Sequence, residues 1–418
     1  MPLRAPTTMN PDINEKKAEE FSPTEHDIEH HAPITKDGIA LHPQPTSDPL
    51  DPLNWSSLKK HIILAIVMAL YFLFTYITTT TVPSFLEIQE LYGISVDQTN
   101  WTIAIPALGL AVGPLVWSSL ADIYGRRIIF IIGTVIALAS TIGAAYAPTF
   151  TGYMAARFFQ GFGVSPAATV GLAIINDIFF EYQRGQKVGL WVLAIDMGLL
   201  VGPLVGGFIG LVSMRWIQHL TAILFGVILL AELVFLPETL YPRNQMLTRL
   251  PYADGATGPT DIEKTTRRPS VADEVDLPRT TKLPFVNVKP VPGMRHPKPW
   301  DSLVRFALTF KYWTIFAVAF IYCFGWYWWI LCVATMIPYA YPQYAPKIQG
   351  LLFLGLIVGT LISEIFMSGS LSDLIVARLA KKNGGVRVAE MRLWLAYPAA
   401  LLSASKSFPF TSIEPVTD

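Results

Sequence analysis

Two ionisable side chains lie inside segments that are otherwise apolar, and both could take part in moving a proton. Arg157 lies in an apolar run near 151–175, and Asp196 lies near the middle of a run near 187–212. A charge within a bilayer is costly unless it is paired or faces water, so each residue marks an interior position. A carboxyl group at that depth takes up a proton more readily than one in water.

We expect Asp196 and Arg157 to share a polar cavity in which protonation of Asp196 weakens their interaction. Other roles are open. Arg157 lies less than two turns from the expected outer end of its helix and could snorkel to the surface, whereas Asp196 could be a hydrogen-bonded structural residue. Glu232 and Glu364 lie near the inner ends of their helices and are expected at the membrane interface. His219 is expected to be a packed polar residue.

Next to Asp196, ten residues read G-x-x-x-G-P-x-x-G-G, which predicts a close helix contact. Its glycines are Gly198, Gly202, Gly206 and Gly207. Glycine at every fourth position lets a second helix approach along one stripe. Pro203 has no N–H, so the carbonyl of Leu199 loses its intrahelical partner and the helix can bend. In lipid, a neighbouring group or water must bind that carbonyl. Ordinary packing of glycine is the alternative.

The segments that carry these residues indicate an all-α membrane protein. Of 418 residues, 52% are hydrophobic and 15% charged, and the mean hydropathy is +0.42, whereas soluble domains carry about 25% charged residues. Eight apolar runs have the length that crosses a bilayer, so the lipid bilayer is an expected partner. They lie near 60–80, 99–119, 128–147, 151–175, 187–212, 216–236, 312–338 and 348–368.

Six of the runs precede a long polar stretch and two follow it, which divides the chain into five expected regions. A short apolar stretch at 392–402 begins like a ninth span but is too short to cross. The regions are a disordered cytosolic tail at 1–55, a six-helix bundle at 56–237, a flexible cytosolic linker at 238–310, a partial second bundle at 311–403 and an aberrant polar tail at 404–418. Lys and Arg concentrate in alternate short loops, which places the N-terminus in the cytosol.

Several classes of function are unsupported by the sequence. The formal net charge is zero, which gives no reason to expect a nucleic-acid partner. No segment reads G-x-x-x-x-G-K-[ST], so no ATP site is expected. The two cysteines, Cys323 and Cys332, share one apolar run and predict neither a disulfide framework nor a zinc site. With no nucleophile triad or paired carboxylates on an interior face, we expect no enzyme, no cofactor and no metal.

Two further motifs accompany the glycine stripe. The loop after the second run reads S-S-L-A-D-I-Y-G-R-R, in which Gly125 can form a tight turn. Asp122 and Arg126 are four residues apart and can pair at the membrane surface, and Arg127 follows. The second motif, R-F-F-Q-G-F-G, begins at Arg157. Its other defining residues are Gln160 and Gly161.

The three motifs resemble motifs A, B and C of the major facilitator superfamily and occur in that family's order. The glycine stripe is similar to motif C, which marks proton-coupled antiporters, and the arginine of motif B is implicated in proton transfer. Motif A has Ser118 and Ile123 where the family has glycine and arginine. The D-P-L-N-W at 51–55 and the P-E-T at 237–239 resemble the fungal twelve-helix drug:proton antiporter branch.

The resemblance implies a major facilitator fold in which two six-helix halves rock about a central site. Here the N-terminal bundle is expected to be complete and the C-terminal bundle incomplete, with about eight spanning helices plus part of a ninth, as in a C-terminally truncated member. The implied function is proton-coupled antiport that exports small amphipathic compounds, such as secondary metabolites or xenobiotics, across the plasma membrane. The alternatives are a non-transporting fragment or regulator of a full-length relative, and a proton-coupled importer of a nutrient such as a sugar.

Overall fold

The protein is described from a computed structural model. It describes residues 48–243, 297–317 and 335–364, together with short pieces at 43, 45–46, 319–320, 374–375 and 378–379. Most of the expected seventh span at 312–338 lies outside the described residues. The short stretch at 392–402 and the predicted tail at 404–418 also lie outside them.

Six helical spans in the described residues are long and apolar enough to cross a bilayer, which confirms the first six predicted runs. They are Ser57–Tyr92, Val96–Tyr124, Arg126–Ala145, Phe150–Ile178, Gln183–Ile209 and Met214–Phe235. Their helices are α3 (Ser57–Thr79), α4 (Phe85–Tyr92), α5 (Val96–Tyr124), α6 (Arg126–Ala145), α7 (Phe150–Val164), α8 (Pro166–Ile178), α9 (Glu181–Ile209) and α10 (Met214–Phe235).

Local sequence explains where several of these helices begin and end. Ser95 and Gln98 form a reciprocal capping box at the start of α5, and the side chain of Thr149 accepts a hydrogen bond at the start of α7. Gly93, with φ of 62°, ends α4 in the left-handed conformation. The single run predicted at 151–175 is broken between α7 and α8, because Pro166 begins a new helix and cannot donate back to α7.

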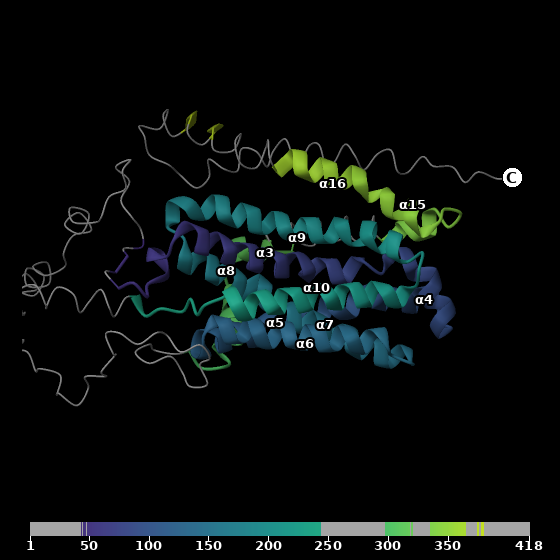
Figure 1. The fold of residues 1–418 in the computed structure, drawn as a ribbon, viewed down its shortest axis with the longest axis horizontal. Coiled ribbons are helices and arrows are strands. Elements are labelled where there is room, and N and C mark those ends of the chain that lie inside the picture. Colours follow the sequence, from purple (N-terminus) through teal and green to yellow (C-terminus); the bar gives the residue numbers. More distant parts are fainter. Residues whose placement is uncertain are drawn as a thin grey trace, which may run out of the picture.

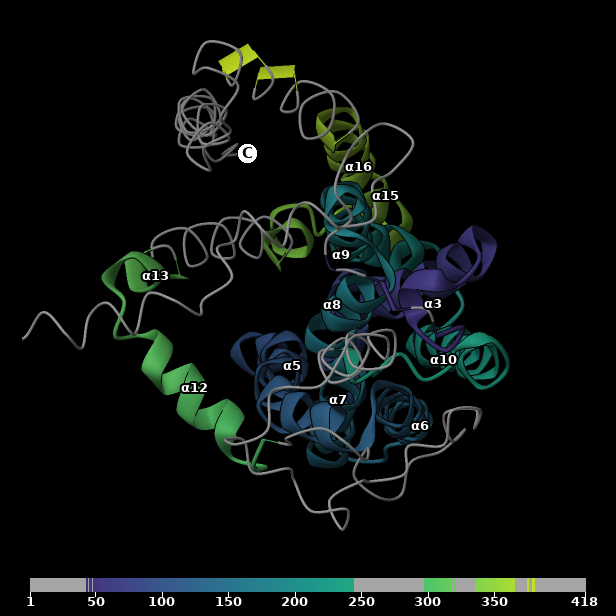
Figure 2. The same cartoon turned by 90° about the vertical axis from the view of Figure 1, so that its left-hand side faces the viewer.

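The long helices lie side by side along the longest axis of the molecule (Figure 1) and are seen nearly end-on in Figure 2. α3 packs closely along α9, and α7 packs against both α5 and α6. One core of buried apolar residues joins these helices, with Val67, Leu70, Phe130 and Ile174 each fully shielded from solvent. The six spans therefore form one bundle with its own core.

Part of the second half is also described. α12 (Asp301–Thr309) lies beside α5, and α13 (Trp313–Ala317) follows it. α15 (Pro346–Leu351) and α16 (Phe353–Ile362) correspond to the eighth predicted run and pack on α9 (Figure 1). The two halves of the chain therefore meet mainly at a face of α9, and Tyr339 adds a contact with Phe85 and Gln89 of α4.

The structure differs from the sequence-based expectation in the polar segments on either side of the bundle, the expected tail at 1–55 and the expected linker at 238–310. Residues 51–55 were expected to be disordered, but Pro52–Asn54 form a 3₁₀ helix and Asp51 is fully buried. Arg243, in the expected flexible linker, pairs with Asp51 at 2.9 Å, and α12 lies within the same expected linker. A buried carboxylate needs such a partner, so both predicted boundaries fall inside ordered structure.

Candidate functional site

Arg157 lies inside the six-helix bundle, and its side chain is 1% exposed. Its Nη1 donates to Oε1 of Gln160 at 2.7 Å and its Nη2 donates to the backbone carbonyl of Thr102 at 3.0 Å. The amide of Gln160 donates in turn to Thr141 Oγ1 at 2.8 Å. The snorkelling alternative is therefore wrong, because the guanidinium is held by groups from α5 and α7, and Thr141 of α6 binds Gln160 in turn.

The carbonyl that Arg157 binds is one that a proline leaves without a partner. Pro106 lies four residues after Thr102 in α5 and has no N–H to donate to it. The close approach of α5 and α7 makes the contact possible, because a Cβ at Gly161 would overlap the backbone oxygen of Pro106. The motif B residues thus bind a helix defect in α5, a role that the sequence analysis did not recognise.

The glycine stripe of α9 lies against α3, as its spacing predicts. A Cβ on any of its first three glycines would meet oxygen atoms of α3 at distances that real Cβ atoms do not reach. The obstructing oxygens belong to Phe72, Thr79 and Thr80, opposite Gly198, Gly202 and Gly206 respectively. Larger residues would force α3 and α9 apart, so the stripe sets the distance between them.

The carbonyl freed by Pro203 has the neighbouring donor that the sequence argument requires. Thr79 Oγ1 donates to the carbonyl of Leu199 at 2.9 Å, which confirms that a group on another helix binds this oxygen. One turn away, Thr75 Oγ1 donates to the carbonyl of Ile195 at 2.6 Å. Two threonines of α3 thus bind backbone carbonyls of α9 at and next to the position that Pro203 leaves without a donor.

The C-terminal end of the glycine stripe, at Gly207, also meets the second half of the chain. A Cβ on Gly207 would meet the backbone oxygen of Pro346 at 2.5 Å, and a Cβ on Gly350 would meet the oxygen of Pro203 at 2.8 Å. Motif C therefore lies between α3 on one side and α15 on the other. Both contacts depend on the absence of side chains.

Asp196 lies half-buried on α9, close to the second half of the chain. Glu364, at the end of α16, lies close enough for an electrostatic interaction with Asp196, and its Oε1 would be 3.7 Å from a Cβ on Gly189. Glu364 thus faces α9, and the expectation that it is interfacial does not describe this contact. The ion pairs among the described residues do not join Asp196 to Arg157, so the predicted shared cavity is not observed in this conformation.

The motif A loop forms the ion pair that its spacing predicts. Arg126 Nη2 lies 3.6 Å from Asp122 Oδ1, and Gly125 turns the chain with φ of 106°. A second carboxylate, which the sequence argument missed, lies closer: Asp177 Oδ2 is 2.6 Å from Arg126 Nε. Asp177 comes from the C-terminal end of α8, so this pairing connects α5, α6 and α8.

Glu238 of the P-E-T segment binds the N-terminus of α6. Its carboxylate accepts hydrogen bonds from the backbone amides of Arg126 at 2.9 Å and Arg127 at 3.2 Å. Unpaired amides and the helix dipole favour a negative charge at this end. The side chain of Arg127 donates to the carbonyl of Leu233 at 2.7 Å. The end of α10 is thereby fixed to the start of α6.

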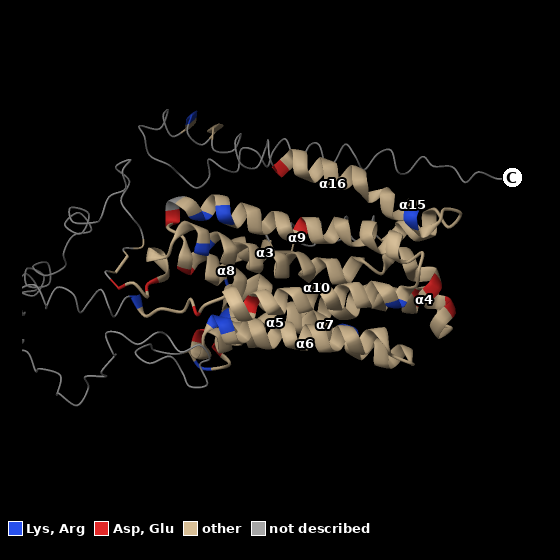
Figure 3. Cartoon of the chain, viewed as in Figure 1, with Lys and Arg blue, Asp and Glu red and all other residues tan. Residues whose placement is uncertain are grey.

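Asp51 and Arg243 extend the polar contacts at the same end of the bundle. Burial alone would raise the pKa of Asp51, but hydrogen bonds from Arg243 and from two backbone amides outweigh it, so this pKa lies below its usual value. The amides are those of Thr46 and Leu53, each 3.0 Å from a carboxylate oxygen. Burial raises the pKa of the nearby Tyr241 to about 12. Lys and Arg gather at this end (Figure 3).

Glu232, which was expected at the membrane interface, lies three residues before the end of α10 at Phe235, but it is covered by protein. Its side chain is fully buried in α10, and its Oε1 accepts a hydrogen bond from Thr134 Oγ1 at 2.9 Å. The sequence placed it near a helix end but could not show that α6 covers it. His219 contacts the rings of Tyr146 and Trp216 at centroid distances of 5.4 and 5.6 Å.

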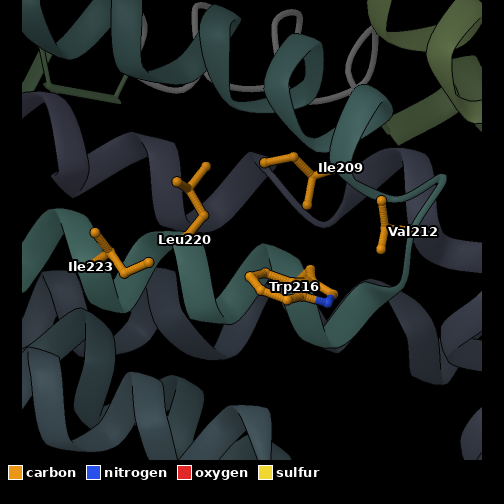
Figure 4. Close-up of a pocket in the computed structure, with 5 residues that line it drawn as sticks. All are labelled: Ile209, Val212, Trp216, Leu220 and Ile223. Atoms are coloured by element: carbon orange, nitrogen blue, oxygen red, sulfur yellow. The ribbon is translucent and has the colours of Figure 1, made fainter.

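A cavity of about 200 Å³ lies beside the C-terminal end of α9 and the N-terminal part of α10 (Figure 4). Its five lining residues are apolar: Ile209, Val212, Trp216, Leu220 and Ile223. Val212 and Trp216 are 71% and 52% exposed, so the cavity opens sideways to the surroundings of the bundle. It has no polar group to orient a substrate, and it lies away from motifs A and B.

The sequence is similar to a family of membrane transporters and to several fungal members of it. The family model described as Major Facilitator Superfamily matches residues 64–415. Protein HOL1 of Saccharomyces cerevisiae is 27% identical over 88% of this chain and 72% of that protein. The MFS-type efflux pump MFS2 of Trichophyton rubrum is 28% identical over 84% of this chain and 56% of its own length.

Efflux pump FUB11 of Gibberella moniliformis is 29% identical over 76% of this chain and 50% of its own length. The chain thus spans about half the length of these two efflux pumps. Among solved structures, a D-xylose-proton symporter matches 77% of this chain and 69% of its own, with a TM-score of 0.48 and 15% identity. A similarity of this level does not discriminate between substrates.

Proposed function

The chain belongs to the major facilitator superfamily, and from this premise we propose that it is a proton-coupled antiporter that exports small amphipathic organic compounds. It is a multi-pass membrane transporter rather than an enzyme, and several of its relatives are named efflux pumps. Export, proton coupling, the substrate class and the plasma membrane location are parts of the proposal.

The contact made by the glycine stripe is the observation that carries the proposal. Gly198, Gly202 and Gly206 allow α9 to lie on α3, while Gly207 allows it to meet α15. In this family, substrate binds between two halves that rock against each other. A glycine-lined helix at their contact supports a role in setting how tightly the halves close, which is the step an antiporter must control.

Asp196 is the residue to which we assign proton binding. It lies on the face of α9 that meets the second half, with the like charge of Glu364 nearby. Its carboxyl group is half-buried and interacts electrostatically with Glu364, so a proton on Asp196 changes the charge where the halves meet. Release of that proton would change the repulsion between α9 and α16. Arg157, in contrast, lies in the bundle's own interior and would act by holding α5.

The arrangement of charge supports a cytosolic N-terminus. Lys and Arg lie mainly at the end of the bundle where α5 meets α6, which includes Arg126 and Arg127 (Figure 3). Basic residues in short loops favour the cytosolic side. Substrate would therefore be taken up at the end that carries motif A.

Transport by the full chain in liposomes tests the proposal. A permanently charged lipophilic cation, tetraphenylphosphonium, serves as the probe, and valinomycin with equal potassium concentrations removes the membrane potential. Antiport predicts that the probe accumulates when the lumen is acidic and that a protonophore abolishes accumulation. Accumulation with an alkaline lumen instead would indicate proton symport, as in an importer. No transport above protein-free liposomes would favour a non-transporting chain.

The proton assignment has its own test. Asp196→Asn should abolish accumulation driven by the pH gradient, while exchange of labelled for unlabelled probe without a gradient continues. Gly226→Ala is a matched control, because no atom lies within 4 Å of a Cβ added there. Gradient-driven transport by Asp196→Asn at the wild-type rate would remove Asp196 from the mechanism.

A further inference from the structure

The helix α12 is amphipathic and its apolar face is exposed. Its sequence is D-S-L-V-R-F-A-L-T, and none of its residues is buried. At 100° per residue, its polar side chains fall on one stripe and its apolar side chains on the opposite side. The polar residues are Asp301, Ser302, Arg305 and Thr309; the large apolar ones are Leu303, Val304, Phe306 and Leu308, each 50% to 58% exposed.

The orientation of α12 differs from that of the spanning helices. Figure 2 looks along the bundle, and α12 extends across that view on the outer side of α5. A helix perpendicular to the spanning helices lies parallel to the membrane plane. α12 therefore has the orientation of an interfacial helix rather than of a spanning one.

A contact with α5 fixes the depth of α12. Ser302 Oγ lies 2.6 Å from Ser119 Oγ, and the backbone amide of Ser302 donates to the same oxygen at 3.3 Å. Ser119 belongs to the motif A segment, five residues before the end of α5 at Tyr124. At 1.5 Å per residue this is about 8 Å from the inner helix end, which corresponds to the headgroup boundary.

Aromatic and basic residues flank the helix in the way that membrane interfaces favour. Trp300, the N-cap of α12, and Trp313, the first residue of α13, are 57% and 74% exposed, and tryptophan concentrates at the headgroup level. The exposed basic residues of the segment 298–311 are Lys298, Arg305 and Lys311. Its one acidic residue is Asp301, so the segment carries a net positive charge. Basic residues next to an apolar face complement the anionic lipids of the cytosolic leaflet.

We propose that α12 lies in the cytosolic headgroup layer, where its apolar face enters the acyl boundary and its basic residues bind the phosphates of anionic phospholipids. Through the contact of Ser302 with Ser119, this membrane contact is connected to the motif A segment. The proposal does not depend on the direction of transport or on the coupling ion. The occupant of the exposed face is the lipid itself.

Nitroxide labels on single cysteines test the position of the helix. The full chain carrying Cys323→Ser and Cys332→Ser is labelled at Leu303→Cys, Phe306→Cys or Thr309→Cys and placed in liposomes that contain phosphatidylserine. Labels at 303 and 306 should be more accessible to oxygen than to a nickel chelate, and the label at 309 should show the reverse. Equal access of the nickel chelate to all three, or protection of 303 and 306 from both reagents, would overturn the proposal.

A second measurement tests the lipid charge. The label at 306 should lie deeper in vesicles with phosphatidylserine than in pure phosphatidylcholine, and Arg305→Gln with Lys311→Gln should remove this difference. Lys347→Gln, at the exposed start of α15 near the outer end of α9, is the matched control and should retain it. A depth that is the same in both lipids before substitution would show that anionic headgroups are not recognised.

Discussion

In two glycine-lined helix contacts, α5 with α7 and α3 with α9, a backbone carbonyl without an intrahelical donor is bound by a side chain, and the donor differs between the two. In each, a proline frees a carbonyl and a side chain from the facing helix binds it. Arg157 binds the oxygen freed by Pro106, and Thr79 binds the oxygen freed by Pro203. The first contact is enclosed by the N-terminal bundle, whereas the second also meets α15. The charged donor, Arg157, thus lies inside the six-helix bundle, whereas the neutral donor, Thr79, lies at the helix pair that also meets the second half of the chain.

The largest effect is expected when a methyl group enters the enclosed contact. Gly161→Ala would place its Cβ against the backbone oxygen of Pro106, which cannot move without α5. We expect a loss of about 3 kcal/mol in the free energy of unfolding, measured by steric trapping in bicelles. Gly226→Ala should be neutral or slightly stabilising, because the added Cβ meets nothing. Equal stability of the two variants would show that the α5–α7 contact is not tight.

Removal of the charged donor, Arg157, should cause the second largest loss in the free energy of unfolding. Arg157→Met leaves the carbonyl of Thr102 and Oε1 of Gln160 without the arginine donor, which we expect to cost about 2 kcal/mol. Arg157→Lys should recover part of this, since one ammonium cannot reach both oxygens. The same unfolding measurement checks the series. If Arg157→Met unfolds like the wild type, the hydrogen bond from the guanidinium to the carbonyl of Thr102 does not contribute to stability.

Removal of the neutral donor should have a smaller effect on stability. Thr79→Val leaves the carbonyl of Leu199 unbound, and hydrogen bonds between membrane helices contribute about 0.6 kcal/mol on average. Thr75→Val, at the contact with Ile195, is a parallel test. A loss as large as that of Arg157→Met would remove the distinction between the two contacts.

The smallest expected effect is the pH dependence of thermal stability. It distinguishes the Asp51–Arg243 pair, whose carboxyl group titrates, from Arg157, which stays charged. The pKa of Asp51 is below its usual value, so its contribution to stability is present above the unfolded-state pKa of about 3.9 and is lost as pH falls through the lower, folded-state value. The difference in thermal midpoint between wild type and Asp51→Asn should be constant from about pH 7 to 5 and shrink below about pH 4.

The corresponding difference between wild type and Arg157→Met should not change over that range, because arginine stays protonated. If the difference from wild type changed with pH by the same amount for Asp51→Asn and for Arg157→Met, acid unfolding of the whole protein, rather than titration of Asp51, would set the pH dependence. The Asp51–Arg243 pair is also the clearest case in which a region expected to be disordered is ordered by a contact distant in sequence.

The first six spans could be predicted because a bilayer requires about 20 apolar residues per helix, and this length is visible in the sequence. The predicted pairing of Arg157 with Asp196 is not observed in the structure, and depth along a helix does not determine the direction in which a side chain faces. Arg157 bonds to Thr102 of α5, and Asp196 interacts electrostatically with Glu364 of the second half. The signal that could have placed Arg157 was Pro106, whose missing N–H leaves a buried acceptor in the neighbouring span.

The sequence by itself determined the number and order of the described spans, the glycine stripe and the need for a donor at Leu199. These follow from local geometry, because a helix repeats every 3.6 residues and proline lacks an N–H. Only the tertiary structure decided which donor is used, that Glu232 is buried and that Glu238 binds the start of α6. Each depends on which helices are neighbours, and that is set by packing between residues more than 90 positions apart.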